Sequence, residues 1–141
     1  MAQKRTTTLD PHGALIFTMV IVSAADADLS DSEMQIIGTI IGHLPAFRGF
    51  ERERLPRLLN DCAESLAGAD GLEETLDAIR AALPANLRET AYAIACDLVA
   101  ADGEASQEEL RVLELIRHRL SIDRLTAAAI ERGARARFQQ L

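Results

Sequence analysis

The sequence is poor in aromatic residues: it has no tryptophan, one tyrosine and four phenylalanines, which together make up 4% of the chain. β-Sheets are rich in β-branched and aromatic side chains, and no segment alternates apolar and polar residues for long enough to form a strand. Alanine, leucine and isoleucine dominate instead, and alanine and leucine are strong helix formers. We therefore predict an all-α protein of about seven helices.

Cysteine is also scarce. Cys62 and Cys96 stand alone and fit no Cys-x-x-Cys spacing, which excludes the usual zinc and thiol-redox motifs. Isolated cysteines in apolar helical segments are typical of reduced core residues in a cytosolic protein. The chain also lacks a glycine-rich phosphate loop, and no Ser-His-Asp or Cys-His arrangement can be named in it. We therefore expect a protein that is not an enzyme.

Basic residues are outnumbered, and the net charge is -7. Such a protein repels nucleic acid and anionic membranes at long range, so we expect no nucleic-acid partner. The charge is unevenly spread, because residues 1–110 carry 8 basic and 19 acidic side chains, whereas residues 111–141 carry 7 basic and 3 acidic ones. This uneven charge suggests that the protein has one acidic and one basic face.

No apolar run is long enough to cross a membrane, since residues 14–25 fall short of the roughly 20 residues that a spanning helix needs. Two basic residues precede this run, as in a signal peptide. However, Asp10 and Pro11 interrupt the approach, and the Ala-Ala-Asp that follows the run recurs at residues 100–102, where it cannot be a cleavage site. We therefore expect a core helix in a cytoplasmic protein.

Capping residues, prolines and apolar spacings divide the chain into helices. We predict helices at residues 10–25, 30–44, 51–66, 70–83, 85–101 and 106–120, and a seventh that begins at Ser121. The third helix has an alternative start near Leu55, because Pro56 fits only in the first turn of a helix. Together they form one domain, residues 10–141, after a flexible segment, residues 1–9. Because Gly38 and Gly42 lie four residues apart on the second helix, we expect another helix to approach closely there.

The chain also contains an internal repeat. When it is shifted by 76 residues, segment 24–34 falls on segment 100–110, with Ala, Ala, Asp, Ser and Glu identical in register. Each copy predicts a helix, an acidic link and a second helix that starts with a Ser-x-x-Glu capping box. We predict two hairpins, about residues 14–47 and 90–123, that pack against each other because neither can bury its apolar stripe alone.

Residues 100–109, Ala-Ala-Asp-Gly-Glu-Ala-Ser-Gln-Glu-Glu, closely resemble the Ala-x-Asp-Gly-Glu-x-Ser-x-x-Glu signature of the TerB-like tellurite-resistance family. The first copy departs from the signature at Ala27 and Asp28. The resemblance implies a compact TerB-like bundle and a non-enzymatic adaptor or sensor in a bacterial tellurite-resistance and stress-response system. It also implies protein partners that bind metal ions and assemble near the membrane, so that any membrane association would be peripheral.

The acidic positions of the two links allow two readings. In the first, the serines and glutamates cap helices and the other carboxylates are solvated. In the second, carboxylates from both links bind a hard cation such as Ca²⁺, Mg²⁺ or Mn²⁺. An EF-hand is excluded because Asp31 and Ile37 occupy the positions that need glycine and glutamate. The candidate ligands are Asp26, Asp28, Glu33, Asp102, Glu104 and Glu109.

Two arginine clusters are candidate partner-binding surfaces for an acidic protein, although arginines of this kind also form ordinary solvated faces. Arg48, Arg52, Arg54 and Arg57 make up the first cluster, and Arg132, Arg135 and Arg137 make up the second. Two alternatives to the adaptor remain open. One is a small-molecule or lipid binder with a pocket between the hairpins, and the other is a metal-dependent hydrolase.

Overall fold

The computed structural model describes residues 9–25 and 30–141, and this part of the chain contains seven α-helices, two 3₁₀ turns and no strand. The prediction of an all-α protein is therefore confirmed. No helix in the described residues is both long and apolar enough to cross a membrane. The elements are α1 (Pro11–Ser23), α2 (Asp31–His43), η1 (Pro45–Phe47), η2 (Arg52–Arg54), α3 (Leu55–Leu66), α4 (Gly71–Ala82), α5 (Ala85–Ala101), α6 (Gln107–Arg119) and α7 (Arg124–Arg137).

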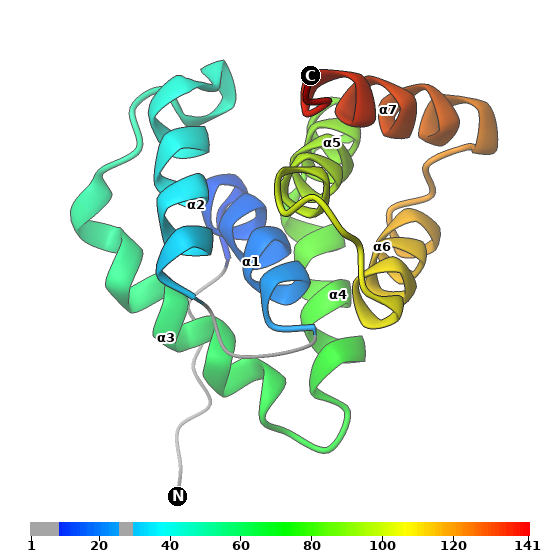
Figure 1. The fold of residues 1–141 in the computed structure, drawn as a ribbon. Coiled ribbons are helices and arrows are strands. Elements are labelled where there is room, and N and C mark those ends of the chain that lie inside the picture. Colours follow the sequence, from blue (N-terminus) through cyan, green and yellow to red (C-terminus); the bar gives the residue numbers. More distant parts are fainter. Residues whose placement is uncertain (1–8, 26–29) are drawn as a thin grey trace, which may run out of the picture.

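Helix α1 lies at the centre of the bundle (Figure 1). Its N-cap is Asp10, whose carboxylate accepts a hydrogen bond of 2.9 Å from the backbone N–H of Gly13. All eleven residues from Gly13 to Ser23 are buried, because α3, α4, α5 and α6 all pack against this helix. The run that resembles a signal peptide is thus the core helix that its composition predicted.

Helices α2 and α6 have the same length, and both begin with a capping box. Their bounds differ by the 76 residues that separate the two copies of the repeat. Both predicted capping boxes form. Ser30 and Ser106 each accept a hydrogen bond from the N–H three residues on, and Glu33 and Glu109 each accept one from the serine N–H. The packing of two equivalent hairpins stays a prediction.

The predicted start of the seventh helix at Ser121 is wrong. Ser121 has φ of 59°, a left-handed conformation that ends α6 and cannot begin another helix. Helix α7 begins at Arg124 instead, with Asp123 as its N-cap; the Asp123 carboxylate accepts a hydrogen bond of 2.9 Å from the backbone N–H of Thr126. The helix therefore begins three residues later than predicted, after the turn at Ser121.

The expected close helix approach at Gly38 and Gly42 is also wrong. Among the described residues, no atom beyond the nearby backbone of α2 itself lies within 4 Å of the position that a Cβ would take at Gly38. The neighbour is a side chain, because the Arg52 guanidinium donates a hydrogen bond of 3.0 Å to the Gly38 carbonyl. The tight approach occurs at Gly71, the first residue of α4, where a Cβ would lie 2.2 Å from the carbonyl oxygen of Leu66.

We predict that Gly71→Ala destabilises the fold by about 1–3 kcal/mol, because the turn between α3 and α4 must open to admit the methyl group. Gly68→Ala is the matched control, since nothing lies within 4 Å of its Cβ position; it should change stability by less than about 0.5 kcal/mol. Urea unfolding of the three proteins measures both values. Equal midpoints for the two variants would contradict the packing described for this turn.

Candidate functional site

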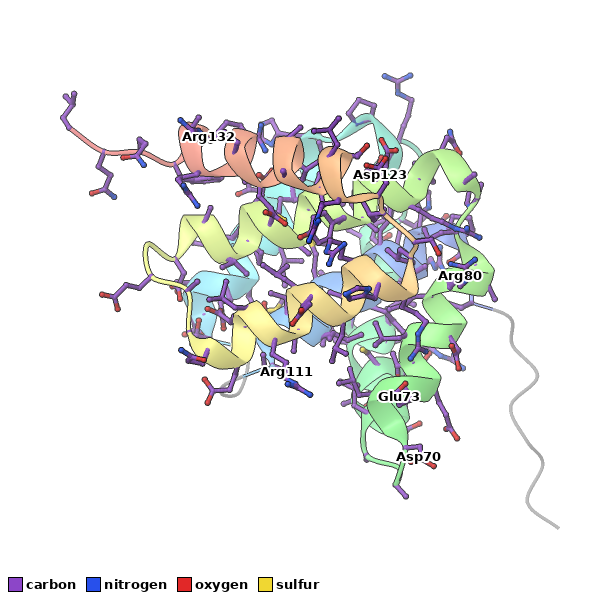
Figure 2. All side chains as sticks on the ribbon, turned by 90° about the vertical axis from the view of Figure 1, so that its right-hand side faces the viewer. Asp70, Glu73, Arg80, Arg111, Asp123 and Arg132 are labelled. Carbon is purple, nitrogen blue, oxygen red and sulfur yellow. The ribbon has the colours of Figure 1, made fainter. Side chains whose placement is uncertain are left out.

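Helices α5, α6 and α7 enclose a groove of about 710 Å³. In the view of Figure 2, α7 runs along one edge, α6 runs in the opposite direction along the other, and α5 lies between them. The buried floor combines residues from all three helices, namely Cys96, Val99, Leu113 and Ala134. This volume lies within the range of ligand-binding clefts.

Two polar contacts hold α7 against α5 and thereby set one wall of the groove. The Tyr92 hydroxyl donates a hydrogen bond of 2.5 Å to the Glu131 carboxylate, and Arg137 forms an ion pair with Asp97. Tyr92 comes before Asp97 on α5, and their partners Glu131 and Arg137 come in the same order on α7, so the two helices run parallel. These two contacts therefore hold the α7 wall of the groove against its floor on α5.

The two ends of the groove differ in character. At the end near the acidic link, Leu110 and Phe138 are 51% and 41% exposed, which is unusual for large apolar side chains. Arg117 lies about two helical turns further along α6, and Glu131 lies about two turns before Phe138 on α7. One end is thus apolar and the other charged, with Arg135 between them on α7.

The thiol and the phenol that line the groove both have raised pKa values. Burial raises the pKa of the Cys96 thiol to about 12, and it also raises the pKa of Cys62, which lies outside the groove lining, to about 12. The pKa of Tyr92 is raised by burial and by its hydrogen bond to Glu131. Thiolates rather than thiols are nucleophilic, so this burial disfavours the nucleophilic form of Cys96 at neutral pH.

The second acidic link lies at the apolar end of the groove, where Gly103 turns the chain with φ of 86°. Asp102 follows α5 as its C-cap, and both Asp102 and Glu104 are exposed. Within the described residues neither side chain accepts a hydrogen bond or forms an ion pair, so the Asx-turn that could compensate Asp102 at the negative end of a helix does not form. Glu109, by contrast, is only 3% exposed.

The predicted cation site is only partly described. Asp26 and Asp28 lie outside the described residues. The prediction that the two acidic links share a cation site depends on these residues and therefore stays untested. Glu33 and Glu109 serve in the capping boxes. In residues 9–25 and 30–141, no three histidine, cysteine, aspartate or glutamate side chains gather in a way that could hold a metal ion. The cation site therefore stays a prediction.

Three of the seven candidate partner-binding arginines have structural partners. Arg54 forms an ion pair of 3.1 Å with Asp10 and lies 5.4 Å from the centre of the Phe50 ring. Arg52 donates to the Gly38 carbonyl, and Arg137 pairs with Asp97. The other four are exposed and form no ion pair within the described part of the chain: Arg48, Arg57, Arg132 and Arg135.

The sequence did not reveal the groove. Its walls depend on how α7 packs against α5, and the start of a helix does not predict this packing. Leu110 and Phe138 also looked like ordinary apolar positions. One signal was present, however: residues 111–141 carry the excess of basic side chains, and they supply both arginines of the groove, Arg117 and Arg135.

A comparison with protein-family models gives one match, to tellurite resistance protein TerB, over residues 12–132. The matched region includes α1 to α6, both acidic links and the first part of α7. No curated protein and no solved structure compared with the chain gives a significant match.

We predict that both thiols of the folded protein react with a disulfide reagent roughly 100-fold or more slowly than in denaturant at pH 8, because burial keeps them protonated. A raised thiol pKa means that the rate should still be rising with pH above pH 9, up to about 12. Stopped-flow absorbance from pH 7 to 10.5 measures the profile, with Cys62→Ala isolating Cys96. A plateau below pH 8 would contradict the inert role of Cys96.

Proposed function

The chain belongs to the TerB family of tellurite resistance proteins, and from this premise we propose that it is a non-enzymatic cytoplasmic adaptor or sensor of a bacterial tellurite-resistance and stress-response system. It acts by binding protein partners of a stress-response complex. Any contact with a membrane is peripheral and passes through those partners.

The groove of α5, α6 and α7 is the observation that supports a binding role. It combines an apolar floor with charged walls, as binding clefts do. Its cysteine is protonated, and its Glu131 carboxylate already accepts a hydrogen bond from the buried Tyr92. A hydrolase needs a base or a metal-bound water aimed at its substrate, and nothing in the described groove supports that alternative.

The exposed arginines support contacts with an acidic partner. Arg132 lies on α7 outside the groove lining, Arg48 follows η1, and Arg57 lies in the first turn of α3. None of the three forms an ion pair within the described residues, so their charges are available to a partner. Exposed charges of this kind mainly raise the rate of association and its dependence on salt.

We predict that Arg132→Glu reduces the recovery of bound proteins from cells exposed to tellurite, because a like charge repels an acidic partner. Arg111→Glu is the matched control: Arg111 is an exposed arginine on α6 that forms no ion pair in the described residues, and Figure 2 shows it at the edge opposite Arg132. Quantitative mass spectrometry of material co-purified at two salt concentrations gives the comparison. Equal, salt-independent recovery with both variants would contradict a partner surface at Arg132.

A divalent cation at the acidic links is the second proposal. The supporting observation is Asp102, an exposed carboxylate at the negative end of α5 with no hydrogen-bond donor among the described residues. Without a cation this charge destabilises the end of the helix, whereas with a cation it would be neutralised. Ca²⁺, Mg²⁺ or Mn²⁺ would take oxygen ligands from the two links, Asp26 and Asp28 with Asp102 and Glu104, and Glu33 and Glu109 could add further oxygens.

We predict that the chelator-treated protein binds at least one of these cations in calorimetry and that Asp26→Asn/Asp102→Asn abolishes the heat. Asp70→Asn is the control, because Asp70 is exposed and its side chain caps nothing. Without cation, Asp102→Asn alone should raise the thermal midpoint slightly, and with cation it should lower it. No heat with any of the three cations, from a folded protein, would contradict this proposal.

A further inference from the structure

We propose that the groove of α5, α6 and α7 binds an amphipathic carboxylate, a medium-chain fatty acid of about eight to ten carbons. Its carboxylate contacts Arg117 and Arg135, and its chain end lies between Leu110 and Phe138. This inference goes beyond the adaptor role, and it needs neither a protein partner nor a cation.

The shape of the groove suits a short acyl chain. The floor is apolar and is built from residues that are already buried, so a chain laid on it gives up contact with water without displacing a polar group. From Leu110 to Arg117 the α6 wall advances seven residues, or ~10.5 Å at ~1.5 Å per residue. An extended chain covers ~1.2 Å per bond, since three backbone bonds span at most ~3.6 Å, so about eight to ten carbons fill this length.

The exposed apolar side chains mark the end of the groove that receives the chain. Leu110 on α6 and Phe138 on α7 stand on opposite walls beside the acidic link, and both are partly covered by an apolar occupant of the groove. Leu125, also on α7 and 81% exposed, does not line the groove. Substitutions at Leu110, inside the groove, and at Leu125, outside it, can therefore separate binding in the groove from binding to exposed apolar surface in general.

Charge fixes the orientation of the ligand. Arg117 and Arg135 stand on opposite walls, and neither forms an ion pair within the described residues. The acidic link, with Asp102 and Glu104, lies at the apolar end and repels a carboxylate. A negatively charged head group therefore points away from the link and towards the arginines.

The acids of the groove do not reverse this preference. Glu131 accepts the hydrogen bond of Tyr92 and lies four residues before Arg135, while Glu114 lies three residues before Arg117. Such spacings place each acid next to its arginine on one helix face. Arginine has five N–H donors in a planar fork, so each arginine can contact its neighbouring glutamate and a ligand carboxylate together.

A helix of a protein partner is the competing occupant. A helix bound in a groove presents apolar residues along its whole contact and charges along both sides. In this groove the exposed apolar side chains gather at one end, Arg117 lies about two turns from that end on α6, and Arg135 lies one turn before Phe138 on α7. One tail and one anionic head match this arrangement better than a helix does.

The test is calorimetric titration of decanoate, below its micelle-forming concentration, into the full chain. Decylamine, with the same chain and the opposite charge, is titrated alongside. We expect decanoate to bind and decylamine to bind at least about tenfold more weakly. Arg117→Ala/Arg135→Ala should weaken decanoate binding by at least about tenfold, and Leu110→Glu should abolish it by placing a like charge beside the chain.

Leu125→Glu and Arg132→Ala are the matched controls, because both residues are exposed on α7 and outside the groove lining; both should bind decanoate as the wild type does. Absence of decanoate binding to the folded wild type, equal binding of decylamine, or unchanged binding by Leu110→Glu would each overturn the proposal. The first result would leave the groove to another occupant, such as a partner helix. The proposed adaptor role is tested by co-purification with Arg132→Glu and Arg111→Glu, which are different residues and a different measurement. The adaptor role and the fatty-acid site can therefore fail separately.

Discussion

The burial of α1 on all sides is the constraint on which the rest of the fold depends. Eleven consecutive residues of this helix are buried, and the only polar side chains among them are Thr18 and Ser23. The Thr18 hydroxyl donates a hydrogen bond of 2.8 Å to the Ala14 carbonyl within the same helix. An apolar helix of this kind must be enclosed, and α3, α4, α5 and α6 enclose it.

This enclosure determines where the groove forms. Because α5 and α6 use their inner faces on α1, the outer face of α5 is left for α7. Helix α7 packs along α5 through Tyr92 and Glu131 at one end and Asp97 and Arg137 at the other. On the far side, α6 is held to α4, since Arg119 forms ion pairs with Glu73 and Asp77, and Arg80 donates a hydrogen bond of 2.7 Å to the Arg119 carbonyl. Figure 2 shows Glu73 and Arg80 on α4. Two helices anchored to different neighbours leave a space between them.

The elements that the sequence predicted well are those whose boundaries depend on local chemistry. The capping boxes at Ser30 and Ser106 and the Asp10 cap each satisfy backbone donors within one turn, and a reader of the sequence can recognise them. The same holds for the uncharged composition of α1. Ser121 shows the opposite case, because its left-handed conformation depends on how α6 and α7 meet. The groove and the ion pairs of Arg54 with Asp10 and of Arg137 with Asp97 depend on contacts between residues more than 35 positions apart. No local sequence pattern predicts such contacts.

The claim that the groove is the working surface of this TerB-family protein can be tested most directly by survival in tellurite. Cells that lack their own copy would carry the wild type, Leu110→Glu or Leu125→Glu at equal protein levels. The account predicts that Leu110→Glu loses protection and that Leu125→Glu, an equal change on an exposed α7 leucine outside the groove, retains it. Equal survival with both variants would contradict a functional groove.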